Sequence, residues 1–183
     1  MKYTCIKTVA IYLLATLPLL ANASTHKVKI THSVMVGDGI AKFIPEGFDA
    51  QKIPSFAIEK EPREQGALPA DWVLVPEFSL TDGKANASLT VPEGTSIYGG
   101  GEVTGSLLRN GKTIKLWNTD SGAYGVDKGT RLYQSHPWMM GVRKDGTAFG
   151  ILFDTTWKAE LSSTDEKLSL IHISEPTRHL RIS

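Results

Sequence analysis

The segment Leu116–Gly125, in the second half of the chain, carries the most chemically informative side chains of the sequence. It places an aromatic ring (Trp117), an amide (Asn118), a carboxylate (Asp120) and a second ring (Tyr124) within a few residues of one another. Aromatic rings suit the apolar C–H faces of a sugar, and amide and carboxylate groups suit its hydroxyls. Composition alone fits equally well an Asx turn, in which Asn118 or Asp120 caps the local backbone.

A second unusual segment, Tyr98–Glu102, holds three consecutive glycines. Glycine permits positive φ and close approach of the backbone to a ligand or to another strand. A phosphate cradle would also need a helix N-terminus and usually a Lys-Ser/Thr pair after the glycines. Val103-Thr104-Gly105 follows instead, so the pattern favours a tight crossover between sheets over a phosphate site.

Acid–base chemistry on a glycosidic bond needs two carboxyl groups held about 5–10 Å apart. Glu102, Asp120, Asp127 and Asp154 lie in the same half of the chain, but their spacing pairs none of them. The sequence therefore nominates no catalytic residue.

Metal and cofactor sites are equally hard to find in the sequence. His26 and His32 lie over a hundred residues from His136, and the single cysteine, Cys5, excludes both an internal disulfide and a cysteine zinc site. We expect no metal site and no cofactor. The basic and acidic residues are nearly balanced, 20 against 19, which does not indicate a nucleic-acid partner.

The elements that must position these side chains are predicted to be short strands. Apolar runs recur about every ten residues between turn-forming residues, and no long stretch keeps helical periodicity without Gly or Pro. Asp145-Gly146, between two apolar runs, is typical of a hairpin. The expected strands are His26–Val36, Phe56–Ile58, Trp72–Val75, Phe78–Leu80, Ala87–Val91, Thr113–Trp117, Trp138–Val142, Thr147–Phe153 and Trp157–Leu161.

Many short strands joined by Gly and Pro turns predict an all-β fold, an antiparallel β-sandwich. The Pro-rich stretch Ile44–Asp71 is expected to be a long loop of this one domain rather than a linker between two domains.

The N-terminal residues 1–23 are predicted to be a secretory signal peptide. Lys2 and Lys7 precede an apolar run of about 13 residues, and Ala21-Asn22-Ala23 offers small residues for cleavage before Ser24. The run is too short for the ~20 apolar residues of a membrane span. We therefore expect a secreted or periplasmic protein that keeps no membrane segment after cleavage and, having lost Cys5, no cysteine.

The C-terminal residues 168–183 resemble the translation of a transposase-type sequencing adapter, codon for codon from Leu168 to Arg178. We interpret them as not native, and we expect the natural protein to continue beyond Lys167. The remaining residues 24–167 hold 16 basic and 18 acidic side chains, which gives a net charge of −2. A chain of that length is sufficient for one domain.

Four motifs, in order, resemble the N-terminal domain of glycoside hydrolase family 31. Tyr98–Glu102 resembles the family's Tyr-Gly-x-Gly-Glu, and Leu116–Asp120 with Tyr124 resembles its Trp-Asn-x-Asp…Tyr. Leu132–Trp138 resembles its Leu-Tyr-x-x-x-Pro-Phe, and Asp145–Asp154 resembles the strand pair that follows. Two positions depart from the family pattern: Thr155 stands where Asn is common, and Trp138 replaces Phe. Residues 24–97 match only in general strand character.

The resemblance implies a galactose-mutarotase-like β-sandwich that precedes a (β/α)8 barrel. In the family the barrel carries two aspartates, a nucleophile and an acid/base, which act through a covalent glycosyl-enzyme. A barrel needs about 250 residues, so the catalytic pair is expected outside this chain. The Trp-Asn-x-Asp loop of the family touches the sugar, which makes Asp120, then Asn118 and Tyr124, the expected substrate-binding residues.

The leading hypothesis is a truncated N-terminal domain of a secreted α-glucosidase-like glycosidase. Its expected partners are an α-linked oligosaccharide and the barrel missing from this chain. A free-standing carbohydrate-binding β-sandwich module is the alternative. A mutarotase-like epimerase is disfavoured because its acid–base pair commonly includes a histidine, and residues 24–167 hold few of them: His26, His32 and His136.

Overall fold

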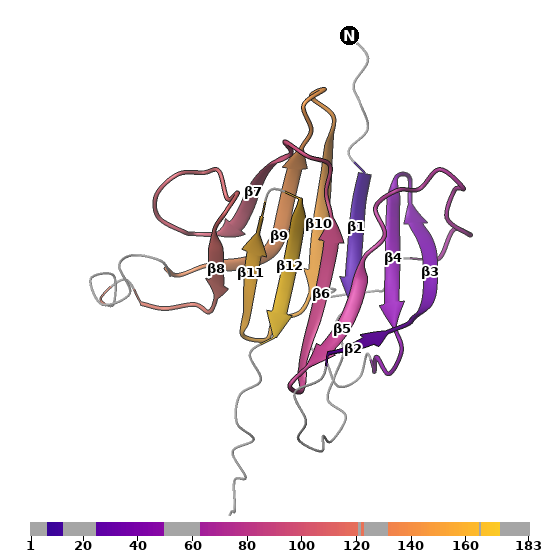
Figure 1. Ribbon diagram of the computed structural model, residues 1–183, viewed down its shortest axis with the longest axis horizontal. Coiled ribbons are helices and arrows are strands. Elements are labelled where there is room, and N and C mark those ends of the chain that lie inside the picture. Colours follow the sequence, from indigo (N-terminus) through magenta and orange to yellow (C-terminus); the bar gives the residue numbers. More distant parts are fainter. Residues whose placement is uncertain are drawn as a thin grey trace, which may run out of the picture.

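The computed structural model describes residues 7–12, 25–49, 63–120, 122, 132–164 and 166–172, with residues 7–12 and 172 described by their backbone alone (Figure 1). The secondary structure of these residues is strands: β1 (Lys7–Tyr12), β2 (His26–Val28), β3 (Ile30–Gly37), β4 (Ile40–Pro45), β5 (Glu77–Thr81), β6 (Lys84–Thr90), β7 (Ser96–Gly101), β8 (Thr113–Leu116), β9 (Ser135–Val142), β10 (Ala148–Asp154), β11 (Ala159–Ser163) and β12 (Lys167–His172).

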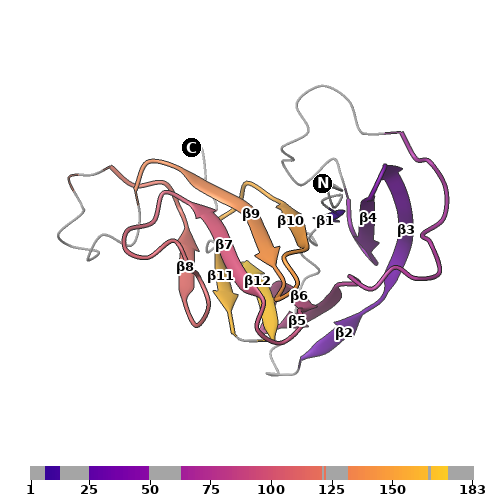
Figure 2. The same cartoon turned by 90° about the horizontal axis from the view of Figure 1, so that it is seen from above.

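The strands form two six-stranded sheets that pack as two layers (Figure 2). Sheet A has the order β3-β4-β1-β10-β9-β7, and sheet B has the order β2-β5-β6-β12-β11-β8. The predicted all-β sandwich is thereby confirmed. The two pairings of β1 are parallel, whereas every other pairing between described strands is antiparallel.

The hydrophobic core lies between the inner faces of the two sheets. Alternate residues of facing strands are fully buried, as strand geometry requires when one face of a sheet packs on another. Phe149, Ile151 and Phe153 of β10 oppose Leu168 and Leu170 of β12 and Leu161 of β11 within one apolar cluster.

Two glycines make room for aromatic rings on opposite faces of sheet A. A Cβ at Gly141 would lie 2.2 Å from the Phe149 ring, which faces the core, and a Cβ at Gly150 would lie 1.9 Å from the Trp138 ring. Phe149 and Gly141 are direct neighbours in the β9–β10 ladder. Each ring therefore covers the backbone of the adjacent strand, a contact that only glycine permits.

Most predicted strands are present. The single strand predicted over His26–Val36 is wrong in its extent, because it is divided into β2, in sheet B, and β3, in sheet A. The other exceptions have local causes. The expected strand Trp72–Val75 is wrong: Trp72 Nε1 donates to the Leu74 carbonyl in a local turn, and the segment joins no ladder. The predicted loop beginning at Ile44 is wrong at its start, because β4 extends to Pro45. The expected strand Phe56–Ile58 lies outside the described residues.

Both ends of the chain contribute a strand. β1 lies within the segment predicted to be a signal peptide, and β12 lies almost entirely within the segment interpreted as adapter-derived. Neither prediction is tested by this placement. Within the part of the chain that the structure describes, no helix is long and apolar enough to cross a bilayer.

Candidate functional site

Two of the sequence motifs are hydrogen-bonded to one connection, Leu132–Ser135, which begins the third motif and leads into β9. From one side, Glu102 donates its backbone N–H to the Gln134 carbonyl (2.8 Å) and accepts the Gln134 N–H with its carboxylate (3.0 Å). From the other side, Thr119 N–H donates to the Leu132 carbonyl (2.9 Å). Segments far apart in the sequence are thus fixed to one short stretch of backbone.

Asn118 ties its own segment to the same connection. Its side-chain oxygen accepts the backbone N–H of Ser135 at 2.9 Å. The amide group of Asn118 therefore orients the loop, although its side chain is exposed overall. A hydrogen bond of this kind typically stabilises by about 1 kcal/mol.

Asp120 lies at the end of this segment with an exposed side chain. One carboxylate oxygen, Oδ1, accepts the backbone N–H of Gly122 at 3.0 Å, which closes an Asx turn. A carboxylate has two oxygens with about four acceptor positions, so the turn leaves acceptor capacity for a ligand hydroxyl. Both interpretations of Asp120 from the sequence are compatible with this geometry.

A shallow pocket of about 380 Å³ opens beside the same segment. It is formed by the start of the Trp117–Asp120 segment, the start of β9 and the residues that follow β10. Its lining residues are Leu116, Trp117, Asn118, Ser135, Pro137, Thr155, Thr156 and Trp157.

The pocket combines two indoles with small polar groups. Trp117 is 42% exposed, and the Lys158 ammonium lies 5.2 Å from the centroid of its ring. Thr155 is buried, and its hydroxyl accepts the Trp157 backbone N–H at 3.2 Å. Aromatic faces beside hydroxyl and amide groups suit a sugar ring better than a purely apolar or a highly charged ligand.

The Tyr98–Glu102 segment has a different character. Predicted as a crossover, it is instead the edge strand β7, paired with β9 and bulged between Gly99 and Gly101. All three glycines have positive φ, from 85° to 116°. A Cβ at Gly101 would lie 2.4 Å from the Gln134 carbonyl oxygen, and one at Gly99 would lie 2.4 Å from the Trp138 carbonyl oxygen. The glycines thus allow close backbone packing.

Arg109 holds this glycine segment through a hydrogen bond to the Gly99 carbonyl. Arg109 is 3% exposed, and its guanidinium donates to the carbonyls of Gly99 (3.1 Å), Ser106 (2.8 Å) and Val103 (3.4 Å). Burial lowers the pKa of the Arg109 guanidinium from its usual value, although an arginine keeps its charge in proteins. The charged guanidinium therefore stabilises the backbone between Gly99 and Ser106 by bonding its carbonyl oxygens.

The predicted site residues are brought together in part. Asn118 and Asp120 lie on one loop beside the pocket, but only Asn118 lines it, and Tyr124 lies outside the described residues. Thr156 and Trp157, which come from a distant segment, also line the pocket but were not predicted from the sequence. Among the described residues, no three acidic, histidine or cysteine side chains gather closely enough to hold a metal ion.

Comparison with known proteins supplies a family for this arrangement. Residues 30–161 match the family model described as the glycosyl hydrolase 31 N-terminal galactose mutarotase-like domain. The chain is 46% identical, over 77 residues, to alpha-glucosidase 2 of Bacillus thermoamyloliquefaciens, an alignment covering 40% of this chain and 10% of that protein.

Two solved structures are similar to this chain, and the second of them supports the same fold. A family 31 alpha-glucosidase from Bacteroides thetaiotaomicron aligns at 92% identity over 50% of this chain and 16% of its own, with a TM-score of 0.44. A family 31 dextranase mutant from Flavobacterium johnsoniae, complexed with isomaltotriose, aligns over 87% of this chain and 25% of its own, at 16% identity and a TM-score of 0.51. The chain thus spans a small part of each of these proteins.

Proposed function

Because this chain belongs to the family of glycosyl hydrolase 31 N-terminal galactose mutarotase-like domains, we propose that it is the N-terminal domain of a secreted, retaining α-glycosidase. The parent protein would hydrolyse or transfer an α-glucosyl unit. The observation that carries this proposal is the 46% identity to an alpha-glucosidase, found in a chain whose family match spans all four sequence motifs.

The domain's proposed role is to supply one wall of the substrate pocket. Asp120 is exposed, two residues after Asn118, which lines the pocket, and its turn leaves acceptor positions on the carboxylate. Trp117 offers an exposed ring face on the same loop, and Asn118 holds the loop on β9. We assign the contact with a sugar hydroxyl to Asp120 and the positioning role to Asn118, and we keep Tyr124 as a further proposed contact.

The bond-breaking residues belong, in this proposal, to the remainder of the parent. A retaining glycosidase needs one carboxylate as nucleophile and another as acid and then base, about 5–5.5 Å apart. The carboxylate of Glu102 is already bonded to the backbone of Gln134, and that of Asp120 to the backbone of Gly122. Both groups are better suited to shaping the loop than to attacking an anomeric carbon.

Secretion remains part of the proposal. Residues 1–23 have the charge, apolar run and small-residue site of an export signal. The destination is the medium or the periplasm, and the α-linked oligosaccharide would be met there.

A hydrolysis assay tests the function. The parent gene, recovered from the source DNA, and residues 24–183 are expressed separately and assayed with p-nitrophenyl α-glucoside. We expect turnover from the parent and none above buffer from residues 24–183. Turnover by the shorter chain would show that the catalytic carboxylates lie within it. An inactive but folded parent would contradict the α-glucosidase assignment.

The pocket itself supports a second candidate, a carbohydrate-binding module that works without a barrel. Two indoles and several hydroxyls already line one cavity of this chain. Titration of residues 24–183 with maltotriose separates the two candidates. A stand-alone module should bind measurably, whereas one wall of a shared pocket should bind negligibly, because most sugar contacts lie on the missing part.

A further inference from the structure

Lys158 lies beside the pocket without lining it. It follows Trp157, which is a lining residue, and precedes Ala159, the first residue of β11. Lys158 is half-buried, and its ammonium lies over one face of the Trp117 indole, 5.2 Å from the ring centroid. Trp117, in contrast, lines the pocket. The indole therefore has the lysine on one side and the pocket on another.

The β8–β11 ladder explains why these two side chains meet (Figure 1). Leu116, the last residue of β8, is level with Ala159. One step beyond the ladder, the same register places Trp117 opposite Lys158, and opposite residues of antiparallel strands have Cβ atoms about 4.5–5.5 Å apart. The Leu116–Ala159 pair is buried in the core. The alternation of side chains along a strand therefore directs Trp117 and Lys158 together, away from the core.

The Trp117 indole lacks a polar anchor. In the part of the chain that the structure describes, its N–H makes no hydrogen bond, whereas the Trp72 indole N–H donates to the Leu74 carbonyl at 2.8 Å. Trp117 is also 42% exposed, and exposed side chains change rotamer on the picosecond to nanosecond timescale. Immobilising a side chain during binding costs free energy. A contact that holds the ring beforehand therefore favours binding.

A cation over the ring face supplies such a contact. The faces of an indole carry the negative part of its quadrupole, and a lysine ammonium within about 6 Å of the ring centroid is attracted to them. Lys158 meets this distance and reaches the ring from outside the pocket. One cation covers one face of a ring, so the opposite face of Trp117 stays available to a ligand. A sugar presents apolar C–H faces that suit an aromatic face.

We propose that Lys158 is a positioning residue of the pocket: its ammonium holds the Trp117 indole by one face, so that the opposite face is presented to a sugar. The inference rests on the proposed function for the identity of the ligand, whereas the hold on the ring is a property of this chain. Lys158 acts on the sugar through the ring and not by direct contact, since it lies outside the lining of the pocket.

Nitrogen-15 relaxation of the tryptophan indole N–H groups tests the hold in the chain of 183 residues. In Lys158→Met, we expect the order parameter of the Trp117 indole to fall from about 0.85 to below about 0.6. Lys158→Arg should retain the order, because a guanidinium over an indole is also a cation–π partner. Lys115→Met removes an exposed lysine that lies two residues before Trp117, level with Glu160, and should leave the order parameter unchanged. The Trp72 indole, which has its own hydrogen bond, is the internal reference.

Steady-state kinetics of the parent enzyme tests the consequence for recognition. Lys158→Met should raise the KM for p-nitrophenyl α-glucoside about two- to fivefold, the effect of one exposed cation–π contact, and leave kcat unchanged. Lys158→Arg should have a KM close to that of the unsubstituted enzyme. In a Trp117→Ala background, Lys158→Met should have no further effect, because changes in two residues that act through the same ring are not additive.

Three results would overturn the proposal. An unchanged order parameter of Trp117 in Lys158→Met would show that the lysine does not hold the ring. An unchanged KM with a more mobile ring would show that the hold has no role in recognition. A rise in KM that persists in the Trp117→Ala background would show that Lys158 meets the substrate directly. If the methionine variant does not fold, Lys158→Gln takes its place, and if the parent shows no turnover, the proposed function fails while the relaxation result still decides whether Lys158 holds the ring.

Discussion

The glycine segment Tyr98–Glu102 and the tryptophan segment Trp117–Asp120 bind the same connection before β9, yet they are built for different purposes. The glycine segment has no room for a Cβ at Gly99 or Gly101 and is held from behind by the buried Arg109. The tryptophan segment is exposed at Trp117 and Asp120 and has one side-chain anchor to β9, Asn118.

In the function that we propose, the difference illustrates how a sandwich presents a binding loop. One segment uses backbone packing to fix the end of the sheet, and the other uses that fixed end as a support for exposed side chains. Functional loops positioned by a rigid scaffold are a general arrangement. Changes in the glycine segment should therefore reduce folding stability, whereas changes in the tryptophan segment should reduce substrate recognition.

The largest effect is expected from Gly101→Ala, with Gly105→Ala as its matched control. Both glycines have φ of +88°, but only Gly101 would place a Cβ against backbone, 2.4 Å from the Gln134 carbonyl oxygen. Positive φ costs about 1–2 kcal/mol for a residue with a side chain, and overpacking adds about 1–3 kcal/mol. In urea denaturation, the free energy of unfolding should fall by about 3 kcal/mol or more for Gly101→Ala and by about 1 kcal/mol for Gly105→Ala. Equal losses would refute the packing role of Gly101.

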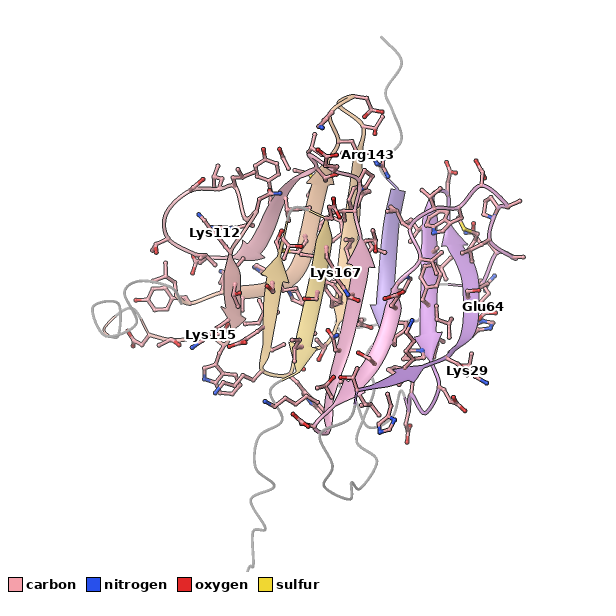
Figure 3. The ribbon with its side chains drawn as sticks, viewed as in Figure 1. Lys29, Glu64, Lys112, Lys115, Arg143 and Lys167 are labelled. Carbon is pink, nitrogen blue, oxygen red and sulfur yellow. The ribbon has the colours of Figure 1, made fainter. Side chains whose placement is uncertain are left out.

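Arg109→Met should have the next largest effect. Three carbonyl oxygens, of Gly99, Val103 and Ser106, lose their guanidinium donor, and hydrogen bonds to a charged group contribute about 1.5–3 kcal/mol. We expect the free energy of unfolding to fall by about 2–3 kcal/mol. Lys115→Met, at an exposed position on β8 (Figure 3), should change it by less than about 0.5 kcal/mol. A small effect at Arg109 would mean that the loop is held by other contacts.

Trp117→Ala should act on recognition, with Trp138→Ala as a control of similar exposure, 42% against 37%. Trp117 lines the pocket, whereas the Trp138 ring covers Gly150 on sheet A. Loss of ring stacking worth about 1–1.5 kcal/mol should raise the KM of the parent about five- to tenfold. Trp138→Ala should lower the melting temperature and leave KM unchanged. An unchanged KM for Trp117→Ala with a raised KM for Trp138→Ala would show that the sugar contact is not on the tryptophan segment.

The smallest effect is expected outside both segments, at the β9–β10 turn. Hydrogen bonds from the backbone and side chain of Thr147 hold the pKa of the exposed Asp145 carboxyl below its usual value. A lowered pKa adds stability above the pKa of the unfolded chain, and this stability is lost as pH falls through the lower folded value. Between pH 6 and about 2.5, the melting temperature of Asp145→Asn should therefore fall slightly less steeply than that of the unsubstituted protein. An unchanged slope would show that the turn does not need the ionised group.

The sequence predicted the architecture well because turns and alternation are local properties. The Asp145-Gly146 hairpin and the strands on both sides of it follow from a few adjacent residues. β7 was missed because three glycines resemble a turn, and its strand character comes from pairing with the distant β9. Trp72–Val75 was predicted wrongly because alternating burial, with Leu74 buried and Val73 and Val75 exposed, also occurs in an extended segment that joins no ladder.

The candidate site was predictable only in its local part. Asn118 and Asp120 were found because their amide and carboxylate lie beside Trp117 in the sequence. Trp157 and Thr156 complete the pocket from the end of β10, and no spacing in the sequence connects them with Trp117. The ladder that pairs Leu116 with Ala159 brings the two segments together, which is a property of the tertiary fold.

Steady-state kinetics of Asp120→Asn in the parent enzyme tests the central claim, that the tryptophan segment meets the substrate. Asparagine can still close the turn to Gly122 with its side-chain oxygen, so the melting temperature should stay the same. Loss of the negative charge weakens a hydrogen bond to a sugar hydroxyl that is worth about 1.5–3 kcal/mol. We predict that kcat/KM for p-nitrophenyl α-glucoside falls about tenfold or more. An unchanged kcat/KM with an unchanged melting temperature would contradict the account.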